Sequence, residues 1–432
     1  MPQESMYAAV DIGTSKIISI VARLGPEGEL KPLGTGVAPS NGVQQGVIDD
    51  FGEVKSSLQE SMSECLRYVG RNPVDRYHVV VNGDHLVSVN STEMLGSREE
   101  VVTITEQRLR SLMSSTSGSL EQQLDSRAEQ TVHMIPMRYR LDGMTGVRNP
   151  TGLDTSELQL EAHIVRGMSV PLGNTVRALQ SCRAKVEGMI AHPLASAEGV
   201  LTADEREMGV VVVDIGGGTV KTAIYRQGTP IYSSVIPMGG NQLTRDMAVA
   251  MRIPYQMAED LKVQFGHALP DAIPANEEVL IPATQVQSRR MVLRRELCEP
   301  LYLRSLQVLK LISEELYRAE IGSMPPGGIV LTGGVSRMPG LAEMASRGLR
   351  ADVRIGVPLW YAGLPDSLRA PEFSAVLGAL QWAVKHRNRP DQGRPRGSGE
   401  RNWSPASLFR RPFARSGARQ AESEPEFEDE QV

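Results

Sequence analysis

The sequence is short of several features that would place it quickly in a class of protein. Aromatic residues make up 4% of its 432 residues, so surfaces for stacking nucleic-acid bases are scarce. The formal net charge of −5 argues against nucleic acid as the main partner. No run of about 18 apolar residues is present, so we expect no transmembrane helix. The first residues, MPQESMYAAV, lack a basic region followed by an apolar run, so we expect no signal peptide.

Cysteine is also scarce, and its positions exclude two further classes. The three cysteines, Cys65, Cys182 and Cys298, lie far apart and match no metal-binding spacing. Their odd number argues against a disulfide framework, so a reducing cytoplasm is the expected setting. The contents of 41% hydrophobic and 22% charged residues are ordinary for a soluble globular protein. The length allows about two to four subdomains with cores of their own.

One short pattern occurs twice. Residues 10–16 read VDIGTSK and residues 213–221 read VDIGGGTVK, each an apolar strand followed by aspartate, a glycine-rich turn with threonine, and lysine. Glycine lets backbone N–H groups approach phosphate oxygens because no Cβ stands in the way. The two aspartates are 203 residues apart (214 minus 11). This repeat predicts a duplicated α/β scaffold that faces one nucleotide from both sides.

We assign the two turns to the phosphates and the metal ion of that nucleotide. Asp11 and Asp214 would hold Mg²⁺ through water molecules, because this ion gives up its water shell reluctantly. Lys16 would neutralise phosphate charge from the side. The other expected phosphate ligands are Gly13, Thr14, Ser15, Gly216, Gly217, Gly218 and Thr219. The alternative for each turn is a β-hairpin that needs glycine only for its tight turn.

Two further segments predict an adenosine site. Residues 329–340, IVLTGGVSRMPG, read as a buried strand that ends in Gly333 and Gly334, where a flat ring can lie against the backbone. In residues 257–266, MAEDLKVQFG, Glu259 and Lys262 are three apart and share a helix face, from which they would reach ribose and adenine. The alternatives are an ordinary strand-to-helix loop and a surface ion pair.

The spacing of apolar residues predicts alternating strands and helices over the first 386 residues. We expect strands at 7–10, 17–21, 77–81, 85–90, 134–141, 158–165, 210–213, 222–225, 230–236, 279–281, 327–331 and 353–356. We expect helices at 53–70, 106–114, 120–130, 171–187, 193–202, 241–251, 255–265, 291–321, 341–347 and 371–386.

Several of these stretches together resemble FtsA, the bacterial actin homologue of cell division. The phosphate turns alone fit all actin-like ATPases. Residues 193–209 (PLASAEGVLTADEREMG) and 237–266 (PMGGNQLTRDMAVAMRIPYQMAEDLKVQFG) are much more specific to this family, and residues 294–300 (RRELCEP) add to the match. The resemblance covers roughly residues 5–386.

The resemblance implies an α/β protein with the actin-like ATPase fold, built from duplicated ribonuclease-H-like halves with an inserted small α/β subdomain. The usual actin subdomain IB is absent in this family, and a subdomain IC is inserted elsewhere. The implied boundaries are 1–83 and 164–207 for IA, 84–163 for IC, 208–240 and 300–370 for IIA, 241–299 for IIB, 371–386 for a helix that returns to IA, and 387–432 for a disordered tail.

The resemblance also implies a function. Such a protein binds ATP with Mg²⁺ between its halves, polymerises with itself, and tethers the tubulin-like FtsZ ring to the cytoplasmic face of the cell membrane at the division site. FtsZ would dock its C-terminal peptide on subdomain IIB, where Arg289, Arg290, Arg294 and Arg295 offer positive charge. A solvated helix face is the alternative for these arginines. We expect no nucleic-acid partner.

Two other functions stay open on the sequence. The first is a PilM-like pilus-assembly actin homologue, which shares the fold and the inserted subdomain but is expected to lack a long tail. The second is a small-molecule kinase of the same superfamily, which needs a catalytic carboxylate near a small-molecule pocket. The sequence offers no clear candidate for that carboxylate.

One departure from the pattern of related ATPases concerns hydrolysis. The heat-shock chaperone and MreB relatives carry a catalytic glutamate just before the proline of a similar helix start, whereas here His192 precedes Pro193. His192 is the one catalytic candidate, and a packing or capping role is the alternative. We therefore expect at most a slow ATPase that acts mainly as a nucleotide-dependent scaffold.

The tail is the second departure. Residues 402–415 begin NWSPASLFRR, in which Trp403, Leu408 and Phe409 accompany several arginines. Arginines with interleaved apolar residues suit the anionic lipids of an inner membrane leaflet, although Pro412 limits a helix here to about two turns. An acidic block at residues 422–430 follows and would repel that leaflet. The alternative is a disordered linker.

Overall fold

The computed structural model describes residues 5–26, 28–67, 69, 74–95, 100–123, 128–282, 289–359 and 364–386. The tail at 387–432, with its candidate membrane segment at 402–415, lies outside the described residues. Within the described ranges, none of the helices combines the length and the apolar character that a membrane crossing requires.

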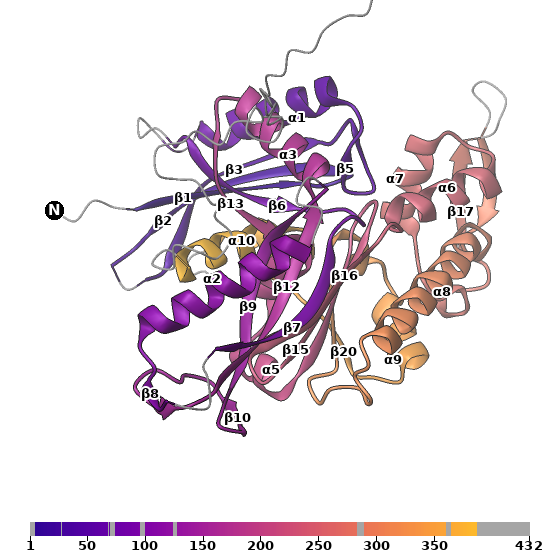
Figure 1. Cartoon of the computed structure of the whole chain (residues 1–432). Coiled ribbons are helices and arrows are strands. Elements are labelled where there is room, and N and C mark those ends of the chain that lie inside the picture. The colour runs from indigo at the N-terminus through magenta and orange to yellow at the C-terminus, as the bar shows by residue number, and fades with distance from the viewer. Residues whose placement is uncertain are drawn as a thin grey trace, which may run out of the picture. The chain divides into compact units, whose positions relative to one another are not determined.

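Two five-stranded sheets with the same topology form the two halves (Figure 1). The first has the order β13-β6-β1-β2-β3 and the second the order β16-β15-β14-β19-β20. In both, the central strand pairs antiparallel with the next strand along the chain and parallel with a strand that follows a long connection. The predicted duplication of an α/β scaffold is confirmed.

The strands of the first half are β1 (Met6–Ile12), β2 (Lys16–Leu24), β3 (Leu30–Pro39), β6 (Arg76–Val81) and β13 (Lys185–Ala191), with the short β4 (Val43–Gln44) and β5 (Val47–Ile48) beside them. The strands of the second half are β14 (Val210–Ile215), β15 (Val220–Arg226), β16 (Thr229–Ile236), β19 (Ile329–Thr332) and β20 (Val353–Ile355).

The sequence of the central strands explains their position. All six residues of β14, VVVVDI, are buried, as are the last five of β1. Valine and isoleucine favour strands, and a strand that is apolar on both faces belongs in the middle of a covered sheet. Asp11 and Asp214 lie near the carboxyl ends of these two strands, where the ligands of open α/β sheets bind.

Two helices connect the halves. The helix α10 (Ser374–Lys385) packs on the first sheet, α4 (His192–Val200) packs on the second, and the two helices contact each other. They touch at glycines: a Cβ on Gly378 would lie 1.9 Å from the Ala195 carbonyl oxygen, and a Cβ on Gly199 would lie 2.2 Å from the Ser374 carbonyl oxygen. A side chain at either glycine would therefore push the two halves apart.

Other helices cover the outer faces. The first sheet is covered by α1 (Phe51–Leu66), which contacts β2 and β3, and by α3 (Ser169–Ser181), which contacts β13. The side chain of Asp50 caps α1, accepting hydrogen bonds from the backbone N–H groups of Gly52 and Glu53. The short α5 (Ala203–Met208) follows α4 and starts with a capping box between Thr202 and Glu205.

An antiparallel sheet in the order β10-β9-β12-β7 forms the inserted subdomain. Its elements are β7 (Val87–Leu95), β8 (Val102–Thr103), α2 (Glu106–Gln123), β9 (Glu129–Leu141), β10 (Met144–Val147), β11 (Asp154–Thr155) and β12 (Leu158–Met168). The helix α2 runs across this sheet (Figure 1). Leu112 on the helix packs with Leu160 and Ile164 on β12 in a separate apolar core.

A hydrogen-bonded junction joins the inserted sheet to the second half at β7 and β16. The Ser88 hydroxyl donates to the Ser233 carbonyl oxygen at 2.7 Å and accepts from the Ser233 backbone N–H at 3.1 Å. Asn90 donates to the Ile231 carbonyl oxygen at 2.9 Å. The ring nitrogens of His163 lie 2.8 Å from Asn90 Oδ1 and 3.1 Å from Ser233 Oγ. At this junction the side chains of β7 form hydrogen bonds with backbone N–H and C=O groups of β16, which within a sheet would pair with the backbone of a neighbouring strand.

A third apolar core lies in the segment that connects β16 to β19. Its elements are α6 (Gly240–Met251), α7 (Tyr255–Phe265), η1 (Pro270–Ala272), β17 (Glu278–Pro282), β18 (Arg289–Leu293) and α8 (Arg294–Arg318). Leu243, Met247, Leu261, Leu297 and Leu301 are buried together there. The remaining elements are η2 (Gly334–Arg337), α9 (Leu341–Leu349), η3 (Asp366–Leu368) and η4 (Pro371–Phe373).

Three predicted helices in the first part of the chain are wrong in their extent. The helices expected at 106–114 and 120–130 are one helix, α2, through Gln123, and residues 129–130 belong to β9. The helix expected at 171–187 ends at Ser181, and β13 starts at Lys185. A short apolar run is compatible with a buried strand as well as with a helix. Residues 185–191 form a strand because they pair with β6.

The start of the long helix is also corrected. Residues 291–293, expected in a helix at 291–321, lie in β18, which pairs antiparallel with β17. The helix α8 starts at Arg294 and ends at Arg318. The subdomain boundaries given above stay predictions, although the inserted subdomain itself is present.

The glycine contact between α4 and α10 predicts a loss of stability for Gly378→Ala. The added methyl group has no room beside the Ala195 carbonyl oxygen, so we expect the free energy of unfolding in urea to fall by about 1–3 kcal/mol. The matched control is Gly348→Ala on α9, where the nearest atom to an added Cβ is 3.6 Å away. That variant should keep or gain up to about 1 kcal/mol. Equal effects of the two substitutions would contradict the packing account.

Two buried histidines predict that acid destabilises the fold. Burial lowers the pKa of His163 to about 4 and the pKa of His133 to about 3. The unfolded chain, with histidine pKa values near 6.5, therefore binds more protons below that pH than the folded chain does. The free energy of unfolding should fall from pH 6.5 toward pH 4, by about 1.4 kcal/mol per pH unit for each histidine. Urea unfolding between pH 7.5 and pH 5 measures this slope.

The matched variant for this experiment is His163→Gln, which removes one of the two most strongly shifted rings. Its slope over the same pH range should be smaller than that of the unmodified chain by up to about 1.4 kcal/mol per pH unit, while His133 and other histidines still titrate. An unchanged slope in His163→Gln would mean that other groups cause the acid sensitivity.

Candidate functional site

The two glycine-rich turns, which are far apart in sequence, face each other across a narrow gap. Asn82, which follows β6, donates from Nδ2 to Thr219 Oγ1 at 3.0 Å, and the backbone N–H of Gly46 donates to Thr14 Oγ1 at 3.1 Å. A Cβ on Gly217 would lie 1.9 Å from Ser15 Oγ. A side chain at Gly217 in the second turn would therefore displace the Ser15 hydroxyl group of the first turn.

A cavity of about 480 Å³ opens beside the two turns. A volume of this size is typical of sites for small molecules and cofactors. Every residue that the sequence assigns to the phosphates, the metal and the adenosine lines it: Asp11, Gly13, Thr14, Ser15, Lys16, Asp214, Gly216, Gly217, Gly218, Thr219, Glu259, Lys262, Gly333 and Gly334. His192 lines it as well.

The cavity also has lining residues that the sequence analysis did not single out. They are Ile18, Asn82, Lys221, Gly240, Asn241, Val263, Val335, Arg337, Met338, Pro339, Glu372 and Ala375. Lys221 stands inside the second repeated pattern, and Asn82 ends a predicted strand, so both carried a signal that could have been used. Glu372 carried none, because only the tertiary structure brings η4 to this cavity.

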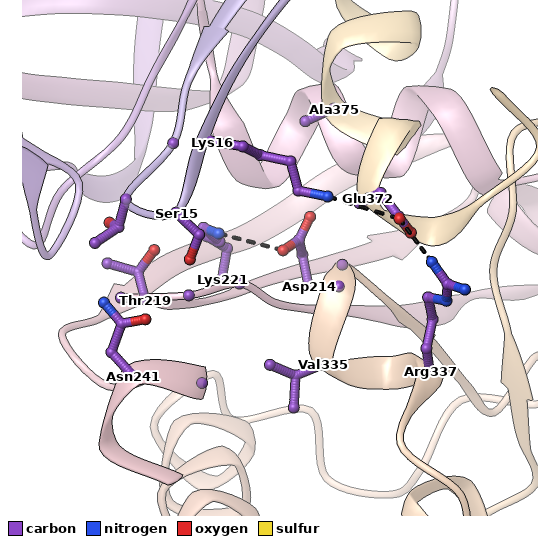
Figure 2. A pocket seen from close by; sticks show the side chains of 18 of the residues that line it. Ser15, Lys16, Asp214, Thr219, Lys221, Asn241, Val335, Arg337, Glu372 and Ala375 are labelled. Atoms are coloured by element: carbon purple, nitrogen blue, oxygen red, sulfur yellow. Dashed lines mark hydrogen bonds and ion pairs between the residues drawn. The ribbon is translucent and has the colours of Figure 1, made fainter. Parts of the chain in front are cut away.

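Three buried side chains surround the carboxylate of Asp214. Ser196 Oγ donates to Asp214 Oδ2 at 2.7 Å and lies 3.2 Å from His192 Nδ1. His192 lies between the two turn aspartates, with Nε2 3.6 Å from Asp11 Oδ2 and Nδ1 3.8 Å from Asp214 Oδ2. Lys221 Nζ lies 3.2 Å from Asp214 Oδ1 (Figure 2). Figure 2 shows this Lys221–Asp214 pair at the centre of the site.

The position of His192 follows from the start of α4. The chain leaves β13 at Ala191, and Pro193 occupies the first turn of the helix, where its missing N–H costs nothing. The first turn of α4 thereby holds the His192 ring between the two halves. The packing role considered for His192 is consistent with its burial, since the residue is 4% exposed.

The surroundings of Asp214 keep it ionised. Burial by itself raises the pKa of this carboxyl, but the Lys221 ammonium, the neighbouring His192 and the hydrogen bonds from Ser196 and Lys221 outweigh burial and hold the pKa below its usual value.

Asp11 differs from Asp214 in its contacts. Its Oδ1 atom is buried and has no hydrogen-bond partner among the described residues. A buried carboxylate oxygen without a partner suits a hydrated cation, and oxygen donors are the ones that Mg²⁺ prefers. Within the described ranges, no group of three or more His, Cys, Asp or Glu side chains could hold a metal ion directly. The donor set therefore fits an ion held through its water shell at Asp11.

A bridging carboxylate links the two halves at another wall of the cavity. Glu372 Oε1 lies 3.6 Å from Lys16 Nζ, on β2 of the first half, and 2.8 Å from Arg337 Nη1, on η2 of the second half (Figure 2). The Glu372 side chain is 12% exposed, whereas the side chains of Lys16 and Arg337 are 36% and 62% exposed. Two cations from opposite halves are held at the cavity by one carboxylate.

Glu259 and Lys262 form a connected group instead of an isolated surface pair. Lys262 Nζ lies 2.7 Å from Glu259 Oε2, 2.7 Å from Thr244 Oγ1 and 3.3 Å from the carbonyl oxygen of Gly240. Glu259 also accepts a hydrogen bond from Thr244. These contacts tie α7 to α6 and hold both side chains at the cavity wall.

The glycine pair after β19 has a steric reason. Gly333 has φ 81°, and a Cβ there would lie 2.6 Å from Asp214 Oδ1 and 2.7 Å from the Ile215 carbonyl oxygen. A side chain is excluded at Gly333 by both backbone conformation and space. At Gly334 no atom lies within 4 Å of an added Cβ, so the backbone there faces open space.

This arrangement of two duplicated halves around one cavity defines the actin-like ATPase fold. The structure is similar to that of the PilM-PilN type IV pilus biogenesis complex, with a TM-score of 0.62 at 13% identity over 88% of this chain and 98% of that chain. It is also similar to MreB5 of Spiroplasma citri bound to ADP, with a TM-score of 0.50 at 14% identity over 89% of this chain and 97% of that one. At these identities the likeness concerns the fold.

The sequence comparisons define the family. Residues 211–378 match the family described as cell division protein FtsA, and residues 83–166 match the SHS2 domain inserted in FtsA. The FtsA of Pseudomonas aeruginosa is 33% identical over 387 residues, which cover 88% of this chain and 89% of the relative. The FtsA of Escherichia coli (strain K12) is 32% identical over 384 residues, covering 87% and 90%. The chain belongs to the FtsA family of cell division proteins.

This membership confirms the resemblance that the sequence predicted and makes the pilus-assembly alternative less favoured. The match to the inserted SHS2 domain, at 83–166, overlaps the insertion expected at 84–163. The β7–β12 sheet and α2 lie within or close to this span.

Proposed function

We propose that this protein is an ATP-binding, actin-like scaffold of cell division that polymerises and links the FtsZ ring to the cytoplasmic face of the membrane, where it recruits further division proteins. The observation that carries the nucleotide part is the meeting of both glycine-rich turns at one cavity. Membership of the FtsA family supports the division part.

In this proposal the two turns hold the triphosphate. Backbone N–H groups at Gly217 and Gly218 and the hydroxyl groups of Thr14, Ser15 and Thr219 are the donors, and Lys16 supplies positive charge. Gly13 lines the site and shapes the first turn, where its own N–H donates to the Lys16 carbonyl oxygen at 3.1 Å. The backbone at Gly333 and Gly334 receives the adenine ring, and the Glu259–Lys262 group binds the ribose or the edge of the base. Mg²⁺, when bound, would neutralise phosphate charge, with its water shell held mainly by Asp11 and less strongly by Asp214, whose oxygens also accept from Ser196 and Lys221.

We infer that nucleotide state, more than turnover, is the output of this site. The position beside the two aspartates is taken by a histidine that packs between them and contacts Ser196. His192 stays the catalytic candidate, as a base for a water molecule at the phosphates. A scaffold that holds ATP and hydrolyses it slowly fits a role in polymer assembly.

The site for FtsZ is proposed on the segment 241–299. Three of the four arginines named in the sequence analysis are occupied in the fold. Arg290 donates to the Met251 carbonyl oxygen at 2.7 Å, Arg294 pairs with Glu277 at 2.7 Å and Arg295 donates to the Ile273 carbonyl oxygen at 2.6 Å. Arg289 is exposed on the β17–β18 hairpin, on the same side as Met291.

The exposed side of this hairpin combines charge with apolar area. Met291 pairs across the hairpin with Leu280, and the two residues are 53% and 48% exposed. A surface that is both basic and apolar complements a peptide with acidic and apolar residues, such as the FtsZ C-terminus is expected to be. We name Leu280, Arg289 and Met291 the hairpin patch.

Attachment to the membrane is proposed for residues 402–415, on sequence alone. Their arginines would be attracted to anionic lipids with about 1 kcal/mol per basic residue near the surface. Trp403, Leu408 and Phe409 supply the apolar side chains that such segments insert.

Substitution of Asp11 tests the nucleotide site. In Asp11→Ala, the carboxylate that faces the hydrated ion is lost, so ATP should bind about three- to fivefold more weakly in Mg²⁺, a change of about 0.7–1.0 kcal/mol. Isothermal titration calorimetry with ATP and MgCl₂ measures this. The control is Asp366→Ala, whose side chain is 99% exposed and lies outside the cavity lining. Unchanged ATP affinity in Asp11→Ala would remove the two-turn site from the proposal.

A reversal of charge on the hairpin patch tests the FtsZ site. We expect Arg289→Glu to weaken binding of a fluorescent FtsZ C-terminal peptide by about tenfold or more, because opposite charge becomes like charge. Fluorescence anisotropy measures the affinity. The control is Arg110→Glu on α2, an exposed arginine of the inserted subdomain, which should leave the affinity unchanged.

The same peptide tests the tail when anionic vesicles are added. The full chain should carry the peptide into the vesicle pellet, whereas residues 1–386 should bind it in solution and leave it in the supernatant. Equal pelleting by the two chains would exclude residues 387–432 as the membrane anchor.

A further inference from the structure

The two halves differ at one matching position. In the β1–β2 hairpin, Asp11 lies opposite Ile18, and in the β14–β15 hairpin, Asp214 lies opposite Lys221. Directly opposed residues of an antiparallel pair point to the same side of the sheet. Ile18 and Lys221 both line the cavity, and they are 1% and 4% exposed. The duplicated scaffold thus carries an apolar residue beside one aspartate and a cation beside the other.

Both oxygens of the Asp214 carboxylate accept hydrogen bonds, one from Lys221 and one from Ser196. Lys221 Nζ lies 3.2 Å from Oδ1, and Ser196 donates to Oδ2 at 2.7 Å. The two paired side chains are 4% and 5% exposed. A water shell that approaches Asp214 has to compete with these two donors.

The ammonium group of Lys221 also lies directly at the phosphate turn. A Cβ on Gly216 would be 2.6 Å from Lys221 Nζ. Among the residues that the structure describes, Asp214 is the one hydrogen-bond acceptor of this ammonium, which has three N–H donors. N–H donors therefore remain for an acceptor in the cavity. A buried ion pair often adds little to the free energy of folding. Binding of a ligand is therefore a plainer reason for a lysine at this position.

Asp11 shows the opposite situation. Its Oδ1 atom is buried without a partner, and the nearest basic side chain, His192, lies 3.6 Å from its other oxygen. An unpaired carboxylate oxygen, which a bound cation could neutralise, is thus found at Asp11. The negative charge of Asp214 is already paired with Lys221.

We propose that Lys221 is a resident cation that stands in for part of the divalent ion's role, so that this protein keeps its nucleotide when Mg²⁺ is removed. This inference rests on the proposed ATP site. A carboxylate near a polyphosphate repels it, and in a site with two free carboxylates the metal ion must offset both repulsions. Paired with Lys221, Asp214 becomes part of a neutral group that still offers N–H donors to phosphate oxygens.

The experiment measures the affinity for ATP by calorimetry in MgCl₂ and in EDTA. For the unmodified chain we expect EDTA to weaken binding by less than about tenfold. In Lys221→Met, which keeps the length of the side chain and removes its charge, Asp214 is left as a buried unpaired anion. EDTA should then weaken binding by about 100-fold or more, while MgCl₂ restores most of the affinity.

Two variants keep the result interpretable. Because Lys221→Met leaves a buried charge unpaired and can unfold the chain, the double variant Asp214→Asn/Lys221→Met removes both charges and should return the EDTA effect to less than about tenfold. The comparison lysine is Lys16, in the first turn, whose side chain is 36% exposed and pairs with Glu372. Lys16→Met should weaken binding by the same factor with and without Mg²⁺.

The outcomes separate this inference from the proposed function. Binding of ATP to the unmodified chain in MgCl₂ but not in EDTA overturns the resident-cation role and leaves the ATP site intact. An equal EDTA effect in Lys221→Met and in the unmodified chain overturns it as well. Absence of ATP binding in both buffers overturns the proposed ATP site, and the inference falls with it.

Discussion

The contact between α4 and α10 is the constraint on which the rest of the structure depends. Each helix packs on the sheet of one half, and they meet where Gly199 and Gly378 leave no side chain between them. This approach brings the carboxyl ends of β1 and β14 to one cavity. The close approach of α4 and α10 sets the positions of both glycine-rich turns, the His192 ring and the carboxylates of the two central strands. Protein interiors are closely packed, so a methyl group added between the two helices would cause strain.

Pairing of opposite charges is the second organising feature, and it is uneven between the halves. Glu372 pairs with both Lys16 and Arg337 at the cavity. Lys262 donates hydrogen bonds to Glu259 and Thr244. Asp214 is neutralised by Lys221, whereas Asp11 keeps a buried oxygen without a partner. The two halves of the duplicated scaffold thus differ at this cross-strand position, with Ile18 opposite Asp11 and Lys221 opposite Asp214.

Much of the fold and somewhat more than half of the residues that line the cavity could be predicted from the sequence. Buried β-branched runs such as β14 and the repeated Asp-Gly turns are local signals, and they predicted the central strands and a set of residues that line one cavity. The errors fall where the local signal is ambiguous. Residues 185–191 look like the end of a helix until β6 supplies a parallel partner, and residues 291–293 look helical until β17 pairs with them. Strand pairing over long sequence separations is not encoded in apolar spacing.

The sequence by itself determined the family, the duplicated scaffold and the identity of the residues at the cavity, because turn chemistry and apolar pattern act over a few neighbouring residues. The tertiary structure decided what those residues touch. It put Glu372 from η4 between two cations, turned the Glu259–Lys262 pair from a surface interaction into a cavity wall, and set Lys221 against Asp214 but only Ile18 against Asp11. The physical reason is that burial and charge pairing depend on distances between distant segments, which are fixed only when the two halves pack together.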